Sequence, residues 1–172
     1  MSRAAFLAFL TALAAHAQSI PWDQHQSLTW NDFKARPRRN TGEPSAMTDT
    51  GFRAQLECRA DTLDIRVAAE FYPASSWIKP PRKSIELLHH EQGHFDLTEL
   101  YARKMRKAIR DASLNCAAEA AGKKILAQLD REWERAEKQY DAATSDGTDA
   151  VNQKDASEKI AQQLAELSRY KQ

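Results

Sequence analysis

This chain of 172 residues has few cysteines and histidines, two and five respectively. Its net charge is small, with 25 basic against 24 acidic residues. The balanced charge argues against a nucleic-acid-binding protein, because phosphate recognition needs a basic surplus on one face. Long hydrophobic runs are scarce too. The run from Ala4 to Ala14 is shorter than the roughly 20 residues of a membrane-spanning helix. We therefore expect neither a nucleic-acid partner nor a membrane span in the mature chain.

The first 17 residues have the pattern of a secretory signal peptide. Arg3 gives a positive start, Ala4 to Ala14 an apolar run, and Ala15-His16-Ala17 a small-x-small cleavage site. Residues 18–172 then have a length that suits a single domain. The sequence predicts an exported protein, and the absence of an N-x-Ser/Thr glycosylation site favours a bacterial periplasm or secretion from a bacterium.

The two cysteines fit an oxidising compartment. Cys58 follows a strand-like stretch and Cys116 lies where a helical pattern ends. An isolated pair in an exported protein more often forms a bridge than stays reduced. We therefore predict a Cys58–Cys116 disulfide, which would stabilise the fold by about 4 kcal/mol in the chain-entropy model.

The hydrophobic periodicity predicts an α+β fold. Two stretches with period-2 alternation indicate a small antiparallel sheet, and three later stretches with helical periodicity indicate a long helical hairpin followed by a C-terminal helix. The predicted strands cover residues 50–57 and 62–71, and the predicted helices cover residues 84–112, 117–143 and 155–170.

The first predicted helix contains an H-E-x-x-H motif, formed by His90, Glu91 and His94. Side chains four residues apart lie one above the other on a helix, so both imidazoles can reach one Zn²⁺. The glutamate beside them can then act as a general base on a zinc-activated water. The motif predicts one zinc ion per chain, bound by the two histidines.

A helical wheel places the histidine pair on the apolar face of this helix. Leu87, Tyr101 and Met105 lie on the same side, so the histidines should point into the protein. The opposite side is charged, and we expect it to face solvent. It carries Asp96, Glu99, Arg103, Lys107 and Arg110.

A catalytic zinc site needs a third protein ligand and keeps one position for water. His89 points away from the pair on the wheel, which favours a supporting or substrate-facing role, and His25 lies in an irregular segment. Carboxylates after the first helix are the better candidates. The wheel leaves Glu132, Asp141 and Asp146 open as the third ligand.

Four segments of the chain resemble DUF922, a family of predicted bacterial secreted zinc-dependent proteases. They are residues 28–33, 76–77, 89–103 and 140–147, and the HEQGHFD stretch is the most specific of them. The family pattern Y-D-x-x-T-x-H-G aligns with the last segment, where Asp146 occupies the histidine position. The resemblance implies peptidase activity and makes Asp146 the third zinc ligand, because carboxylate oxygen is an accepted zinc ligand.

The motif and the resemblance together predict a zincin-like metallopeptidase that hydrolyses peptide bonds in a peptide or protein substrate. His90, His94 and Asp146 would bind one Zn²⁺, and Glu91 would act as general base. The alternative is a non-catalytic secreted module in which zinc stabilises a helical binding platform. The sequence indicates neither the cleavage specificity nor the oligomeric state.

Overall fold

The structure is a computed structural model that describes residues 19–24, 27–37 and 44–172. The predicted signal peptide and His25 lie outside these residues. Along the chain the five strands come first and the three α-helices follow, with short 3₁₀ helices among them. The strands are β1 (Ile20–Pro21), β2 (Ala46–Met47), β3 (Thr50–Arg59), β4 (Thr62–Phe71) and β5 (Trp77–Ile78), and the α-helices are α1 (Ile85–Ala112), α2 (Glu119–Thr144) and α3 (Ala150–Glu166).

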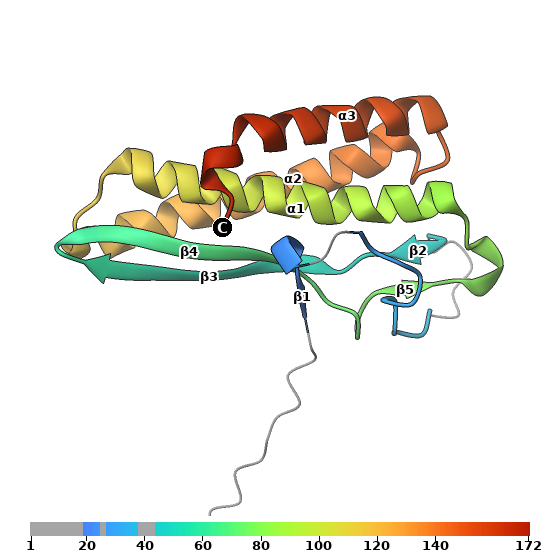
Figure 1. Ribbon diagram of the computed structural model, residues 1–172, viewed down its shortest axis with the longest axis horizontal. Coiled ribbons are helices and arrows are strands. Elements are labelled where there is room, and N and C mark those ends of the chain that lie inside the picture. The colour runs from blue at the N-terminus through green and yellow to red at the C-terminus, as the bar shows by residue number, and fades with distance from the viewer. Residues whose placement is uncertain (1–18, 25–26, 38–43) are drawn as a thin grey trace, which may run out of the picture.

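The fold is α+β, as the periodicity predicted, with the strands in one layer and the helices on one side of it (Figure 1). A three-stranded antiparallel sheet has the order β1-β4-β3, and β2 pairs with β5 in a separate two-stranded sheet. The hairpin between β3 and β4 closes through Ala60 and Asp61, whose φ angles are 46° and 60°. Positive φ at both central residues is what a two-residue hairpin with a type I′ turn requires.

Helix α1 begins and ends with recognisable caps. The side chain of Ser84 accepts a hydrogen bond from the amide of Leu87, which satisfies one of the free donors of the first turn. The helix stops at Ser113, which adopts the left-handed conformation. The start of this helix therefore agrees with the prediction to within one residue.

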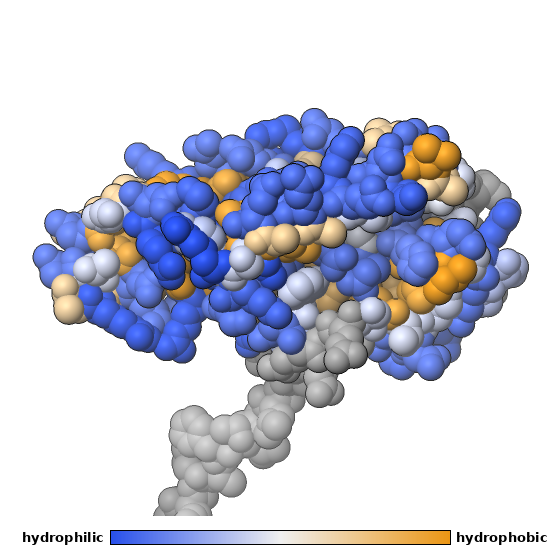
Figure 2. All heavy atoms as spheres, turned by 45° about the horizontal axis from the view of Figure 1, so that its top comes forward, coloured by the Kyte–Doolittle hydropathy of each residue, from blue (hydrophilic) through white to orange (hydrophobic). Residues whose placement is uncertain are grey.

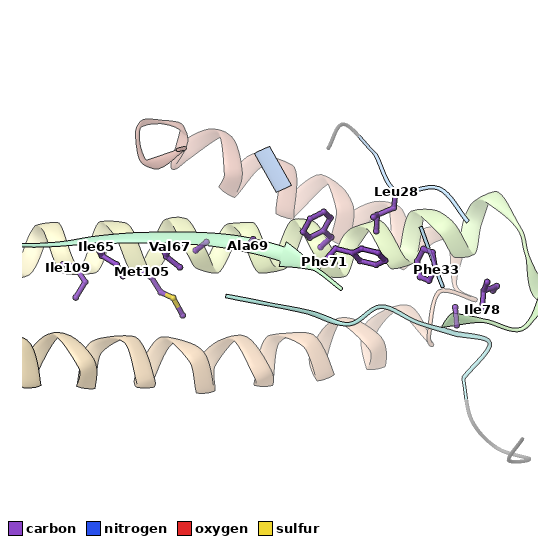
Figure 3. Packing of buried hydrophobic residues seen from close by; sticks show 12 residues of the cluster. Leu28, Phe33, Ile65, Val67, Ala69, Phe71, Ile78, Met105 and Ile109 are labelled. Atoms are coloured by element: carbon purple, nitrogen blue, oxygen red, sulfur yellow. The ribbon is translucent and has the colours of Figure 1, made fainter. Parts of the chain in front are cut away.

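One side of α1 packs on β4 and forms the larger hydrophobic core. Alternate side chains of the strand belong to this core: Val67 lies near Met105 and Ile109 of the helix, and Phe71 lies farther along, next to Phe33 (Figure 3). The side chains of Val67, Phe71, Met105 and Ile109 are fully buried. A second hydrophobic cluster joins α1 to α2 and α3.

The charged side of α1 is not exposed as expected, and this prediction was wrong for Glu99 and Arg103, each of which is 4% exposed. Arg103 lies between Trp22, whose ring is 5.3 Å from its guanidinium carbon, and the carbonyl oxygen of Leu164 in α3. The Glu99 carboxylate accepts hydrogen bonds from Arg103 and Arg106, both at 2.8 Å. The two guanidinium groups also donate to the carbonyl oxygens of Leu164 and Val67. A charged face can be buried here because its charges are paired and hydrogen-bonded.

Helix α3 begins five residues before the predicted start at residue 155. The side chain of Asp149 accepts hydrogen bonds from the amides of Val151 and Asn152, and this cap fixes the first turn. The predicted end at residue 170 includes a short 3₁₀ turn that follows the helix. The short strands β1, β2 and β5 were not predicted, because two residues are too few to show alternation.

The surface is hydrophilic over most of the visible face, with hydrophobic residues in small separate groups (Figure 2). Among the described residues, no helix combines the length and the apolar character that crossing a membrane requires.

The predicted disulfide is present between Cys58 and Cys116, whose Cα atoms are 5.4 Å apart. It joins the end of β3 to the turn that precedes α2. The amide of Leu63, in β4, also donates a hydrogen bond of 2.8 Å to the carbonyl oxygen of Leu114, which lies between α1 and α2. The bridge therefore holds the hairpin to the connection between α1 and α2.

We predict that replacing Cys58 and Cys116 together by serine lowers the free energy of unfolding by about 4 kcal/mol, because the bridge closes a loop of 58 residues in the unfolded chain. Urea denaturation measures the change, with the wild type under reducing conditions as the matched comparison. Two free thiols in the exported protein under denaturing, non-reducing conditions would contradict the bridge.

Candidate metal centre

The H-E-x-x-H motif lies at the end of the molecule where β2, the first turns of α1 and the connection from α2 to α3 come together (Figure 1). A cavity of about 210 Å³ opens there. Its walls come from the segment around β2, from α1, and from the end of α2. The lining residues are Pro44, Ser45, Ala46, Met47, Thr48, Leu87, His90, Glu91, His94, Glu137, Asp141 and Asp146.

Three possible metal ligands converge in this cavity. The Nε2 atoms of His90 and His94 are 3.2 Å apart. Oδ1 of Asp141 lies 3.2 Å from the first and 3.0 Å from the second. Among the described residues these three form a group whose donor atoms all lie within 4.8 Å of one another. Both histidines are buried, whereas the Asp141 side chain is 41% exposed.

The other ring nitrogen of each histidine has its own partner. Nδ1 of His90 lies 3.0 Å from Oε1 of Gln153 and 3.3 Å from Oγ1 of Thr144. Nδ1 of His94 is hydrogen-bonded to the carboxylate of Glu137. A metal-binding histidine normally donates its second N–H to such an acceptor, which fixes the tautomer and the ring orientation.

Tyr140 holds the two imidazole rings in place. Its ring stacks on that of His90 with centroids 4.9 Å apart and planes at 8°, and it meets the ring of His94 edge-on. Its hydroxyl donates to the carbonyl oxygen of His90 at 3.2 Å. The tyrosine is therefore a structural support of the pair, with its hydroxyl engaged inside the protein.

Glu91 is buried beside the histidine pair and lines the same cavity. Thr48, in the connection from β2 to β3, donates a hydrogen bond of 2.6 Å to its Oε2 atom. Burial raises the pKa of the Glu91 carboxyl, while His94 and the Thr48 hydrogen bond act to lower it. One carboxylate oxygen is thus held by Thr48, which sets the direction of the other.

The electrostatics of the cluster favour positive charge between the three side chains. Burial opposes protonation of His94, but its hydrogen bonds to Asp141 and Glu137 outweigh burial and raise its pKa to about 10. Burial acts to raise the pKa of Asp141, and the hydrogen bonds from the two histidines outweigh this and lower it. In the absence of a metal the carboxylates attract a proton to the position that a cation would fill.

The three carboxylates that the sequence offered as the third zinc ligand lie in different places. Asp141 supplies the oxygen that meets both histidines. Asp146 lies in the turn after α2 and lines the same cavity, but its side chain is not in the convergent group. Glu132 lies further back on α2, where it accepts a hydrogen bond from Gln128. His89 is exposed and lines a different cavity, between α1 and α3.

Sequence reasoning missed the residues that support the ligands. Glu137 could have been found, because it precedes Asp141 by four residues and so shares its face of α2. Thr48 and Gln153 carry no such signal. They are distant in the sequence, and only the packing of the β2 segment and α3 on α1 brings them to the centre.

Gly93 of the motif is required by the close approach of Tyr140. A Cβ atom at this position would overlap the tyrosine hydroxyl and lie 2.5 Å from its Cζ atom. The absence of a side chain therefore lets the tyrosine stack on His90. Gly147 has a similar role with a φ of +78°, because a Cβ there would lie 2.7 Å from the Cβ and Cγ atoms of His90.

The sequence was compared with known protein families, curated proteins and solved structures. The model of a family described as "Bacterial protein of unknown function (DUF922)" matches residues 22–147. Neither the curated proteins nor the solved structures gave a match. The matched segment includes the motif, Glu137, Asp141 and Asp146, and it ends before α3.

We predict that Gly93→Ala lowers the free energy of unfolding by about 1–3 kcal/mol, the usual cost of forcing extra atoms into a packed site. Urea denaturation provides the measurement. The matched background is Tyr140→Phe, which removes the overlapping hydroxyl, so the alanine should cost less there than in the wild type. An equal cost in both backgrounds would show that the hydroxyl is not the group that excludes a side chain at Gly93, because Cζ of the ring, 2.5 Å from the added Cβ, is present in both.

Proposed function

The chain belongs to the DUF922 family, and from this premise we propose that it is an exported zinc-dependent metallopeptidase. The observation that carries the proposal is the convergence of His90, His94 and Asp141 beside the buried carboxylate of Glu91. Imidazole nitrogen and carboxylate oxygen are the usual zinc ligands of hydrolytic enzymes. The proposal therefore rests on four side chains in one cavity, and the family description adds no activity to it.

The donor set fits a divalent cation. Gln153 and Glu137 can accept the Nδ1 protons of His90 and His94, which leaves both Nε2 lone pairs directed at the oxygen of Asp141. Three acceptor atoms this close together repel one another unless a cation or protons lie between them. A zinc ion would satisfy all three at once.

The accessibility of the cluster favours a catalytic site over a structural one. A structural zinc ion is enclosed by four protein ligands, whereas a catalytic one has three and keeps a position for water. The convergent group has three members among the described residues, and Asp141, which lines the cavity, has a side chain that is 41% exposed. This supports an enzyme over the alternative of a zinc-stabilised binding module.

Each part of the chain then has a task in peptide hydrolysis. When bound, zinc would polarise the substrate carbonyl and make a water molecule more acidic. Glu91 accepts the proton from the attacking water and returns it to the leaving amine. Thr48 keeps the Glu91 carboxylate oriented through its 2.6 Å hydrogen bond. The peptide or protein substrate would enter the cavity between β2 and α1.

The location follows from two independent features. The signal-peptide pattern of residues 1–17 would direct export, and the Cys58–Cys116 bridge is of a kind that persists in oxidising compartments. We therefore propose a periplasmic or secreted enzyme.

We predict one zinc ion per chain in the purified protein, lost when His90 and His94 are both replaced by alanine. Asp141→Ala should lose most of its zinc, because its oxygen meets both histidines, and Asp146→Ala should retain it. Elemental analysis after dialysis against a weak chelator measures the content. If Asp146→Ala lost its zinc and Asp141→Ala kept it, Asp146 would be the third zinc ligand. Unchanged zinc content in the double histidine variant would contradict the proposed metal site.

We predict that Glu91→Gln keeps its zinc and loses peptidase activity by about 10²-fold or more, since proton transfer by a positioned side chain contributes about 10²–10⁴. The substrate is an unfolded, alkylated protein, with cleavage followed by mass spectrometry. The control is Glu134→Gln, which changes an exposed glutamate of α2 and should keep full activity. Failure of the wild type to cleave a broad peptide library would favour the non-catalytic module.

A further inference from the structure

Helix α3 contributes one buried polar side chain to the metal centre. Gln153 is 7% exposed, and it lies outside the segment that the family match covers. Its Oε1 atom is 3.0 Å from Nδ1 of His90. We infer that Gln153 is a positioning residue that fixes the tautomer and orientation of His90 for metal binding. This inference rests on the proposed metal centre and adds α3 to it.

The direction of the Gln153 amide is set by its other contacts. Its Nε2 atom donates to the hydroxyl of Tyr140, and to Oγ of Ser157 at 3.1 Å. The tyrosine hydroxyl itself donates to the carbonyl oxygen of His90, so it accepts from the amide. The carbonyl end of the glutamine must therefore face His90, because the two ends of an amide have opposite hydrogen-bonding roles.

An acceptor facing Nδ1 assigns the ring proton to that nitrogen. Thr144 agrees with this assignment, because its hydroxyl donates to the carbonyl oxygen of Tyr140 at 2.8 Å and so offers a lone pair to His90. Nε2 of His90 is then left with its lone pair, directed toward Asp141 and His94. This is the form of histidine that binds a metal.

The two histidines are held by acceptors from different helices. Glu137 on α2 orients His94, and Gln153 on α3 orients His90. Displacement of α3 would remove the carbonyl from His90 and the amide donor from Tyr140 at the same time. The geometry of the centre thus depends on the docking of α3 as well as on the motif in α1.

The test compares the zinc affinity of the wild type, Gln153→Leu and Gln153→Glu, each freed of metal and titrated against a chromophoric chelator. Leucine has a similar size and no acceptor, so Gln153→Leu should bind zinc about 10–100-fold more weakly, as found for other supporting partners of metal-bound histidines. Gln153→Glu keeps an oxygen toward Nδ1 and should restore most of the affinity. Gln162→Leu changes an exposed glutamine on the same helix and should bind zinc as the wild type does.

Circular dichroism and urea denaturation of the metal-free variants show whether each is folded. A folded Gln153→Leu protein that binds zinc as tightly as the wild type would overturn the positioning role and leave the metal centre standing. A wild type that binds no zinc would overturn both. A second measurement needs no variant: the ¹H–¹⁵N spectrum of the zinc-loaded wild type should show a proton on Nδ1 of His90, and its absence there would overturn the assignment even if Gln153→Leu failed to fold.

Discussion

The burial of α1 on nearly all sides is the constraint on which the rest of the structure depends. The sheet covers one side of the helix, and α2 and α3 cover the other. Many polar side chains of α1 are consequently taken out of water, and each must find partners inside the protein. The source of these partners differs between the half of the helix that carries Glu99 and the half that carries the candidate metal centre.

The C-terminal half satisfies its charges within the protein. Glu99 lies between Arg103 and Arg106, and the two guanidinium groups reach the carbonyl oxygens of Leu164 and Val67. Opposite charges and carbonyl acceptors are combined in one network. Removing a single member would leave a buried charge without compensation, which typically costs about 3–5 kcal/mol. This network joins α1 to α3 and the sheet.

The N-terminal half gathers carboxylates and imidazoles, and the described residues that line its cavity include no arginine or lysine. Glu91, Glu137 and Asp141 meet there around His90 and His94. The cluster therefore needs positive charge from elsewhere, either as protons on the imidazoles or as a bound cation. Among the described residues only the network around Glu99 contains cationic side chains, and this contrast supports the proposal that the other cluster binds a cation.

The sequence alone was sufficient to predict features that show in residue spacing or in the number of a residue type. Periodicity located the hairpin and the three helices, cysteine scarcity predicted the bridge, and the spacing of His90, Glu91 and His94 gave the part of the site that lies on one helix. It could not show that Glu99 and Arg103 would be buried, or which carboxylate would approach the histidines. Both outcomes depend on how helices distant in the sequence pack on α1, which a wheel drawn for one helix does not contain.

Helix α3 shows why this packing matters to the site. It contacts α1 at both polar networks, through the Leu164 carbonyl at one end and the Gln153 amide at the other. A helix fixed at two points of a rigid neighbour can place a side chain more exactly than a loop can. The ion-pair network around Glu99, although remote from the cavity, holds one end of the helix whose other end meets His90. Helix α3 thus connects the proposed metal centre with the buried charges of α1.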